Sequence, residues 1–300
     1  MFNFRTDLAD ERRDLYKKAN SIENEVNGIE TQIENVNEKI KITRVKIINE
    51  EGEKSIGDYI TIDIKKINLL TDEELEKASE VLAEELKKLI QEKIKYKDDV
   101  LVVGLGNEEV TPDALGPNVI KNVEVTRHII NYLPQYIDEN ARPVSAIAPG
   151  VLGTTGIETL EIIKGVIEHV KPKLLIVIDA LASRSMERIS STIQISNTGI
   201  VPGAGVGNTR KEISINTLGI PVIAIGIPTV VETAVVVNDA LNIFIEKLQQ
   251  EAKSNEYLNN LKENDNYEEI KEALLPKEFN FIVTPKEIDE LVLSMAEVVA

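Results

Sequence analysis

Four short apolar runs set the fold class of this chain. They read VLVVGL, PVSAIAP, LLIVIDA and PVIAIG, at residues 100–105, 143–149, 174–180 and 221–226. Segments with the length and apolar spacing of helices lie between and after them, at residues 115–132, 156–169 and 229–248. A continuous apolar run is typical of a strand buried on both faces. Strands that alternate with helices form a parallel sheet. The sequence therefore predicts an α/β fold, with a mostly parallel sheet and helices on both faces.

The first hundred residues predict a small strand and helix addition to that sheet. Residues 1–40 carry apolar side chains at helical spacing and favour a helix or a pair of helices. Residues 41–51 and 58–66 predict two antiparallel strands. Residues 71–95 have a 3.6-residue apolar period and a capping box of Thr71 and Glu74, so they predict a long helix.

Three further segments lie before or after the last predicted core elements. Residues 191–196 (STIQIS) predict one more strand. Residues 251–275 are rich in Asn, Glu and Lys and predict a polar insertion. Residues 283–300 predict an amphipathic helix opened by Thr284 and Pro285.

Composition argues against several classes of function. The chain has 34 Lys and Arg against 51 Asp and Glu, a formal net charge of −17, whereas phosphate binding needs a basic surface. It has no cysteine, which excludes thiol nucleophiles, disulfides and cysteine-bound metals. No apolar segment has the length of a membrane span or of a signal peptide core. We therefore expect a cytoplasmic protein with no direct nucleic-acid partner and no membrane association.

Two aspartates stand at the predicted carboxyl ends of core strands, where open α/β sheets bind their ligands. Thr111-Pro112-Asp113 predicts an N-cap followed by a first helical turn, so we expect the helix dipole to keep Asp113 ionised. Asp179 ends the apolar run 174–180. Two neighbouring carboxyls share one proton, and such a pair can activate water and protonate a leaving nitrogen. Each acid also has a purely structural reading, as a helix-stabilising charge or an acceptor for turn amides.

A glycine-rich loop, GIVPGAGVGNTRKE at residues 199–212, is the next candidate. Its spacing matches neither of the common phosphate-binding motifs, so we expect it to line a substrate site beside the aspartates. The candidate substrate contacts are Arg184, Gly203, Gly205, Gly207, Asn208 and Arg210. A structural turn with solvated charges is the alternative. His128 and His169 fall in predicted helices, and no serine elbow or HExxH motif is present.

Longer stretches carry a family resemblance. They are FNFRTDLA at residues 2–9, VGLGN and TPDALGP within 103–117, RPVSAIAPGVLGTTGIET, VIDALASR, TIQISNTGIVPGAGVGN and LGIPVIAIGIPTVV. Together they span nearly all of residues 100–235 and include the N-terminus. In these blocks the sequence resembles the spore germination proteases, endopeptidases that start the degradation of small acid-soluble spore proteins. The resemblance implies a fold similar to that of the hydrogenase maturation proteases.

The resemblance also implies roles for individual residues. Asp113 and Asp179 match the acids held to be catalytic in this aspartic-type family, which uses no cofactor. The family is made as an inactive zymogen, so self-cleavage near Asp7 and Leu8 would remove residues 1–7. Residues 8–300 would then form a single α/β protease domain with the polar insertion at about 251–275. The family is associated with a homotetramer and with the forespore or spore core.

Two other functions stay open. In a metal-dependent endopeptidase like the hydrogenase maturation proteases, Asp113 and Asp179 would be ligands, with a histidine completing the site. Two carboxylates without a nearby histidine loop make a weak transition-metal site. The second alternative is a non-catalytic α/β module that binds a nucleotide or anion through its glycine-rich loop. An inactive member of the family is a further possibility, which the presence of both aspartates argues against.

Overall fold

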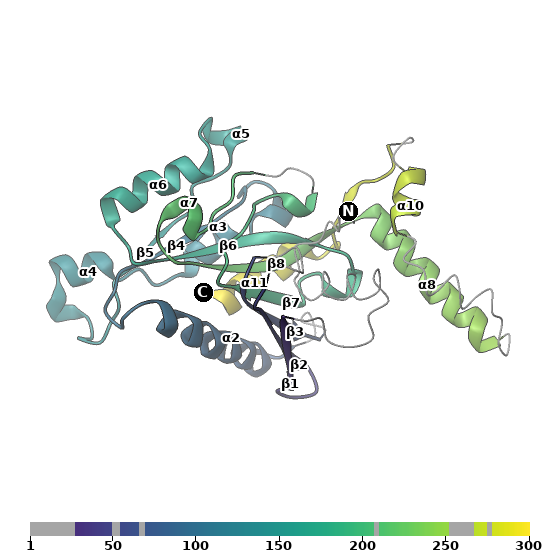
Figure 1. Cartoon of the computed structure of the whole chain (residues 1–300), viewed down its shortest axis with the longest axis horizontal. Coiled ribbons are helices and arrows are strands. Elements are labelled where there is room, and N and C mark those ends of the chain that lie inside the picture. Colours follow the sequence, from purple (N-terminus) through teal and green to yellow (C-terminus); the bar gives the residue numbers. More distant parts are fainter. Residues whose placement is uncertain (1–27, 50–54, 66–69, 207–209, 252–266, 275–277) are drawn as a thin grey trace.

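A computed structural model describes residues 28–49, 55–65, 70–206, 210–251, 267–274 and 278–300. Within them nine strands form one sheet, in the order β1-β2-β3-β7-β8-β6-β4-β5, with β9 paired to β8 (Figure 1). The strands are β1 (Ile29–Asn35), β2 (Ile40–Ile47), β3 (Gly57–Ile64), β4 (Val100–Gly104), β5 (Val144–Ile147), β6 (Leu174–Ser183), β7 (Thr192–Ser196), β8 (Val222–Glu232) and β9 (Ile282–Val283).

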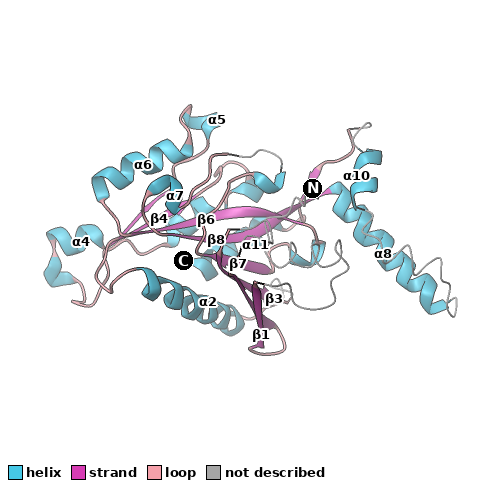
Figure 2. Ribbon diagram, in the orientation of Figure 1, coloured by secondary structure: helices cyan, strands magenta, loops and turns pink. Residues whose placement is uncertain are grey.

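Helices cover both faces of this sheet, which confirms the predicted α/β class (Figure 2). The described helices are α2 (Asp72–Lys93), α3 (Leu115–Asn122), α4 (Arg127–Tyr132), α5 (Leu152–Thr155), α6 (Thr159–Val170), α7 (Ile215–Leu218), α8 (Thr233–Glu251), α10 (Tyr267–Leu274) and α11 (Ile288–Val299), of which α8 and α10 project away from the sheet. Helices α2, α3 and α11 pack on one face, and α6 packs on the other. None of the described helices is long and apolar enough to cross a membrane.

The sheet has a parallel half and an antiparallel half. Strands β5, β4, β6 and β8 run parallel to one another, and they correspond to the four apolar runs of the sequence. Strand β7 runs antiparallel to β8 and joins it to the N-terminal strands β3, β2 and β1. The predicted N-terminal addition is therefore a continuation of the same sheet.

Alternation along β6 decides which way its polar residue faces. Leu174, Ile176 and Ile178 pack into the core on the face of α2, α3 and α11. Leu175 and Val177 pack against α6 on the other face. Because side chains alternate along a strand, Asp179 continues the row of Leu175 and Val177. Its carboxyl therefore belongs to the α6 face.

Three local predictions are wrong. Residues 29–35 form strand β1 instead of helix, because Ile29, Thr31 and Ile33 also have a period of two and pair with β2. The predicted helix at 115–132 breaks into α3 and α4. Between them Thr126 turns its hydroxyl to the carbonyl of Arg142 and accepts a hydrogen bond from the amide of Val144. The rest of the predicted N-terminal helical region, up to residue 27, lies outside the described residues.

The third error concerns the end of β8. The predicted helix starts at residue 229, whereas β8 continues to Glu232 and α8 begins at Thr233. The β-branched residues Val230 and Val231 pair with β6, and Val231 and Glu232 also pair with β9. This longer strand brings residue 229 to the sheet instead of the solvent.

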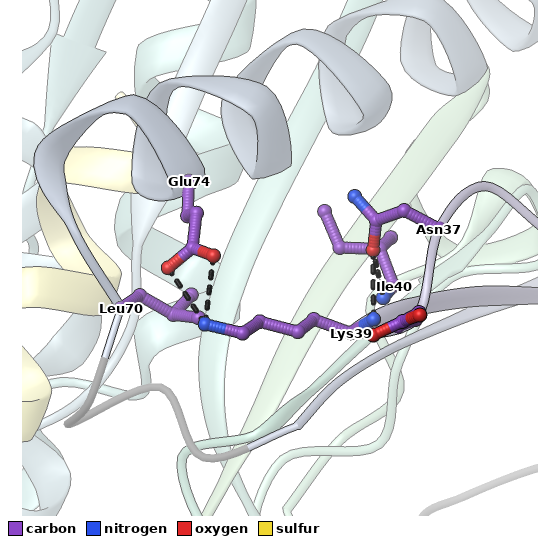
Figure 3. A pocket seen from close by; sticks show the side chains of 6 residues that line it. Asn37, Lys39, Ile40, Leu70 and Glu74 are labelled. Carbon is purple, nitrogen blue, oxygen red and sulfur yellow. Dashed lines mark hydrogen bonds and ion pairs between the residues drawn. The ribbon is translucent and has the colours of Figure 1, made fainter.

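Helix α2 begins where its capping box predicts, with Thr71 as N-cap. The amide of Thr71 donates to Oε2 of Glu74 at 3.0 Å, as the capping box requires. Lys39, in the turn between β1 and β2, places its ammonium 2.7 Å from Oε1 of the same Glu74 (Figure 3). Asn37 holds that turn by accepting from the amides of Lys39 and Ile40, each at 2.8 Å. The N-terminal hairpin is thereby tied to the helix beneath it.

A buried polar cluster anchors α10 to the end of β8. Glu232, Tyr267 and Lys271 are 8%, 2% and 7% exposed. The ammonium of Lys271 lies 2.7 Å from Oε2 of Glu232, which also accepts from the Tyr267 hydroxyl and, at 3.3 Å, from the Asn280 amide. Helix α10 lies within the predicted polar insertion, whose residues 252–266 are outside the described part.

Candidate active site

Asp113 and Asp179 line the same cavity, which has a volume of about 530 Å³. The cavity lies at the carboxyl ends of β4, β6 and β8. The loop after β4, the start of α6 and the glycine-rich loop after β7 complete its walls. Parallel strands end at a common edge, so the fold joins two acids that are 66 positions apart (179 − 113).

A tight turn after β4 positions Asp113. The amide of Leu105 donates to the carbonyl of Ile178 at 2.8 Å and extends the pairing of β4 with β6. Gly106 then turns the chain with a φ of 112°, and a Cβ there would lie 1.9 Å from the carbonyl oxygen of Asp113. The next amide, that of Asn107, donates to Oδ2 of Asp113 at 2.8 Å. Only glycine fits this approach, so Gly106 and Asn107 act as positioning residues for the Asp113 carboxyl.

Asp113 does not lie in the first turn of the helix. Residues Thr111–Asp113 form a short 3₁₀ turn, and α3 begins at Leu115 with Ala114 as its N-cap. The predicted N-cap role of Thr111 for that helix is therefore wrong. Burial raises the pKa of Asp113, and the hydrogen bond from the Asn107 amide opposes this rise without cancelling it. A lowering of this pKa by a helix terminus is not found, because desolvation raises it instead.

Asp179 lies inside β6 instead of ending it. The strand continues to Ser183, and Asp179 faces Gly226 of β8 in the parallel register. Its side chain belongs to the α6 face, and the residue is only 5% exposed. A strand interior is a rigid support, so Asp179 is the more firmly held of the two acids.

The structure brings some of the predicted substrate contacts to the cavity and not others. Gly203, Gly205 and Arg210 line it. Gly207 and Asn208 lie outside the described residues. Arg184 is not among the lining residues, and its guanidinium carbon lies 3.7 Å from the centre of the Tyr267 ring. Arg184 therefore belongs with the cluster on α10.

Several lining residues were not predicted. The cationic Lys211 and the acidic Glu158 also line the cavity, as do Thr229 of β8 and Ile282 of β9. Lys211 follows Arg210 in the predicted loop, and that adjacency is the one sequence signal available for it. The other three come from segments far apart in the chain, so no local pattern marks them.

The donor set fits a transition metal poorly. Across the part of the chain that the structure describes, no group of three or more His, Asp or Glu side chains is arranged to hold a metal ion. His128 lies on α4. His169, at the end of α6, has its Nδ1 2.8 Å from the carbonyl oxygen of Gly165. Neither histidine lines the cavity. The cavity lining thus offers three carboxylates, those of Asp113, Asp179 and Glu158, and no imidazole ligand.

Comparison with known proteins gives consistent matches. A family model described as germination protease matches residues 6–262. A germination protease of Clostridium acetobutylicum is 48% identical over 309 residues, covering 100% of this chain and 94% of that protein. A germination protease of Clostridium perfringens is 47% identical, with the same coverage, and one of a Geobacillus strain is 39% identical, covering 100% of this chain and 92% of that protein.

One solved structure is also similar. It is a [NiFe] hydrogenase maturation protease of Thermococcus kodakarensis, 18% identical, covering 47% of this chain and 80% of that one with a TM-score of 0.32. A TM-score of this size supports no conclusion about the cavity or its residues.

Proposed function

Since the chain belongs to the germination protease family and is therefore a protease, we propose that it starts the degradation of small acid-soluble spore proteins through the carboxyl pair Asp113 and Asp179. The observation that carries this proposal is the shared cavity: both acids line it, at the edge of the sheet where α/β proteins bind their ligands. Desolvation raises the pKa of Asp113, which favours its protonated form, as proton sharing requires of one member of the pair.

The proposed step is an acid–base hydrolysis of a peptide bond. One carboxylate takes a proton from water as the water oxygen attacks the scissile carbonyl carbon. The other carboxyl gives its proton to the leaving nitrogen as the carbon–nitrogen bond breaks. The pair as a whole gains one proton and loses one, so it returns ready for the next cycle. Which of Asp113 and Asp179 starts as the base is left open in this scheme.

The glycine-rich loop would hold the substrate chain above this pair. Gly203 and Gly205 line the cavity without side chains, which leaves room for a polypeptide backbone. Arg210 and Lys211 add positive charge to the lining of the cavity, and Glu158 adds a further carboxylate. We infer that these charged side chains contact polar groups of an extended peptide.

Cleavage without a metal is the first test. We expect the purified protein to cleave a recombinant small acid-soluble spore protein equally well with and without excess EDTA, as followed by gel electrophoresis and mass spectrometry. Heat-inactivated protein is the control. Cleavage that EDTA abolishes and added metal restores would favour the metal-dependent alternative, with Asp113 and Asp179 as ligands.

Self-processing is the second test. The proposed cut near Asp7 and Leu8 falls outside the described residues, so it rests on the family resemblance. We expect the intact mass of active protein to lack about the first seven residues, and the Asp179→Asn variant to keep them. An active protein that still begins at Met1 would contradict the zymogen proposal. The homotetramer and the spore-core location carry over from the same resemblance, and light scattering and immunolocalisation check them.

A further inference from the structure

The pairing of β6 with β8 contains a bulge at the cavity. Leu181 of β6 is opposite Pro228 of β8, and the next residue of β6, Ala182, is opposite Val230. Thr229 is thus an extra residue with no opposite number on β6. Bulges beside active sites change the direction of a side chain, and they are built features of a fold.

The bulge interrupts the side-chain alternation of β8 at Thr229. Ile223, Ile225 and Ile227 of β8 pack into the core on the face of α2 and α11, and Thr229 comes next in that alternation. Thr229 nevertheless lines the cavity that contains Asp113 and Asp179. It is also only 1% exposed, so its hydroxyl lies in a largely desolvated place.

Two distant segments hold the bulge in position. The carbonyl of Pro228 accepts a hydrogen bond from the amide of Ser190 at 2.7 Å. The carbonyl of Thr229 accepts one from Oγ1 of Thr284 at 2.8 Å. Ser190 precedes β7 and Thr284 precedes α11, so two remote parts of the chain fix adjacent peptide groups. These two bonds occupy the carbonyl groups of Pro228 and Thr229 and do not involve the Thr229 hydroxyl.

From this arrangement we propose that Thr229 is a substrate-binding residue, whose hydroxyl donates a hydrogen bond to a backbone carbonyl of the peptide in the cavity. The proposal rests on the proposed protease function and adds one specific contact to it. Thr229 is a hydroxyl residue in a strand that is otherwise apolar from Val222 to Val231. Because Thr229 has little access to water, the carbonyl of a bound peptide is the acceptor that its hydroxyl would use.

The test compares Thr229→Val with Thr229→Ser. Valine keeps the shape and removes the hydroxyl, and serine keeps the hydroxyl. With a recombinant small acid-soluble spore protein as substrate, we expect Thr229→Val to raise KM about three- to tenfold, the size of one lost hydrogen bond, with kcat within about twofold. We expect Thr229→Ser to stay within about twofold of wild type in both constants.

Two controls separate binding from folding. Thr61, on β3, is equally buried at 1% exposure and does not line the cavity, so Thr61→Val should leave KM unchanged. Thr284→Val removes the anchor of the bulge, and we expect it to raise KM in the same direction as Thr229→Val. The combined variant should be no worse than Thr229→Val, because both changes act through one side chain. The melting temperature of each variant shows whether it folds.

The outcomes distinguish the proposed role of Thr229 from the proposed protease function on which it rests. Wild-type KM in Thr229→Val, or equal damage in the valine and serine variants, would overturn the role of the hydroxyl and leave the protease function standing. Affinity of a fluorescently labelled spore-protein peptide for the Asp179→Asn background gives a second reading, free of turnover. If wild type neither cleaves nor binds that peptide, the proposed function and the Thr229 contact fail together.

Discussion

Asp179→Asn should lower the rate of substrate cleavage about a hundred- to ten-thousandfold, and Asp113→Asn should do the same. Acid–base catalysis by a positioned carboxyl contributes on the order of a hundred- to ten-thousandfold, and each member of a proton-sharing pair is needed for both halves of the cycle. The carboxamide matches the carboxyl in size but cannot take up or release the proton. Cleavage of a recombinant spore protein by the purified variants measures the effect.

Asp113→Asn should lower activity but should not lower stability. Burial raises its pKa, so its ionised form is penalised in the folded state at neutral pH. The favourable contribution of this group is present below its unfolded pKa and is lost as the pH rises through the folded one. Asp113→Asn removes that penalty, so its melting temperature should equal or exceed that of wild type. Exposed Asp138, outside the cavity, is the matched control for Asp-to-Asn exchange.

Three results would contradict the catalytic roles proposed for Asp113 and Asp179. Full cleavage by either Asn variant would remove that residue from the mechanism. Loss of cleavage together with a large fall in melting temperature would instead mark the aspartate as structural. If the Asn variants lose activity and EDTA also abolishes cleavage by the wild-type protein, both aspartates would be assigned as metal ligands.

Lys271→Met should destabilise the protein by about 3–5 kcal/mol. The ammonium of Lys271 is buried beside Oε2 of Glu232, and its removal leaves a buried carboxylate without its countercharge. Burial by itself raises the pKa of Glu232, but the hydrogen bonds from Lys271, Tyr267 and Asn280 outweigh that effect and hold the pKa below its usual value. Denaturant unfolding at neutral pH measures the loss.

The pH dependence of stability provides a second test of the Lys271→Met prediction. Because the pKa of Glu232 is depressed in the folded protein, the stability it adds is present above its unfolded pKa and is lost as the pH falls through the folded one. In Lys271→Met that contribution is gone, and protonation of Glu232 relieves the uncompensated charge. The difference between variant and wild type should therefore shrink as the pH falls from about 7 to about 4.

A surface pair supplies the control for Lys271. Lys77 lies 2.8 Å from Glu80 on α2, with the two side chains 47% and 56% exposed. An ion pair exposed to solvent contributes little to stability, so Lys77→Met should change the free energy of unfolding very little. Equal effects of Lys77→Met and Lys271→Met would contradict the assignment of the α10 cluster as a buried anchor.

The sequence predicted those parts of the fold that depend on local pattern. Strands β4 and β6 and the first half of β8 follow from apolar runs, because burial on both faces leaves no place for polar residues. Strand β5 also follows from its apolar run, although it is half-buried at the edge of the sheet. Helix α2 follows from its period and its Thr71 and Glu74 capping box. The meeting of Asp113 and Asp179 in one cavity was also predictable, since parallel strands present their carboxyl ends on one edge.

What the sequence could not predict depends on partners far along the chain. Strand β1 has apolar residues that fit both a helical and an alternating period, and only pairing with β2 decides between them. The extension of β8 and its bulge at Thr229 need β6, Ser190 and Thr284 in place. The raised pKa of Asp113 comes from burial that the turn at Gly106 creates, and a dipole argument from sequence had the wrong sign.

The order of strands in the sheet also determines when the protein can fold during synthesis. Tyr59 of β3 pairs with Ser196 of β7, and the last helix, α11, buries Val292, Met295 and Val298 in the main core. At a synthesis rate of about 5–20 residues per second, β7 is made on the order of ten seconds after β3. An open strand edge of this kind attracts other chains unless charged residues protect it. Asp58 and Asp63 carry such charges on β3. In the folded protein Asp58 accepts a hydrogen bond from Asn197, and Asp63 accepts one from Thr192.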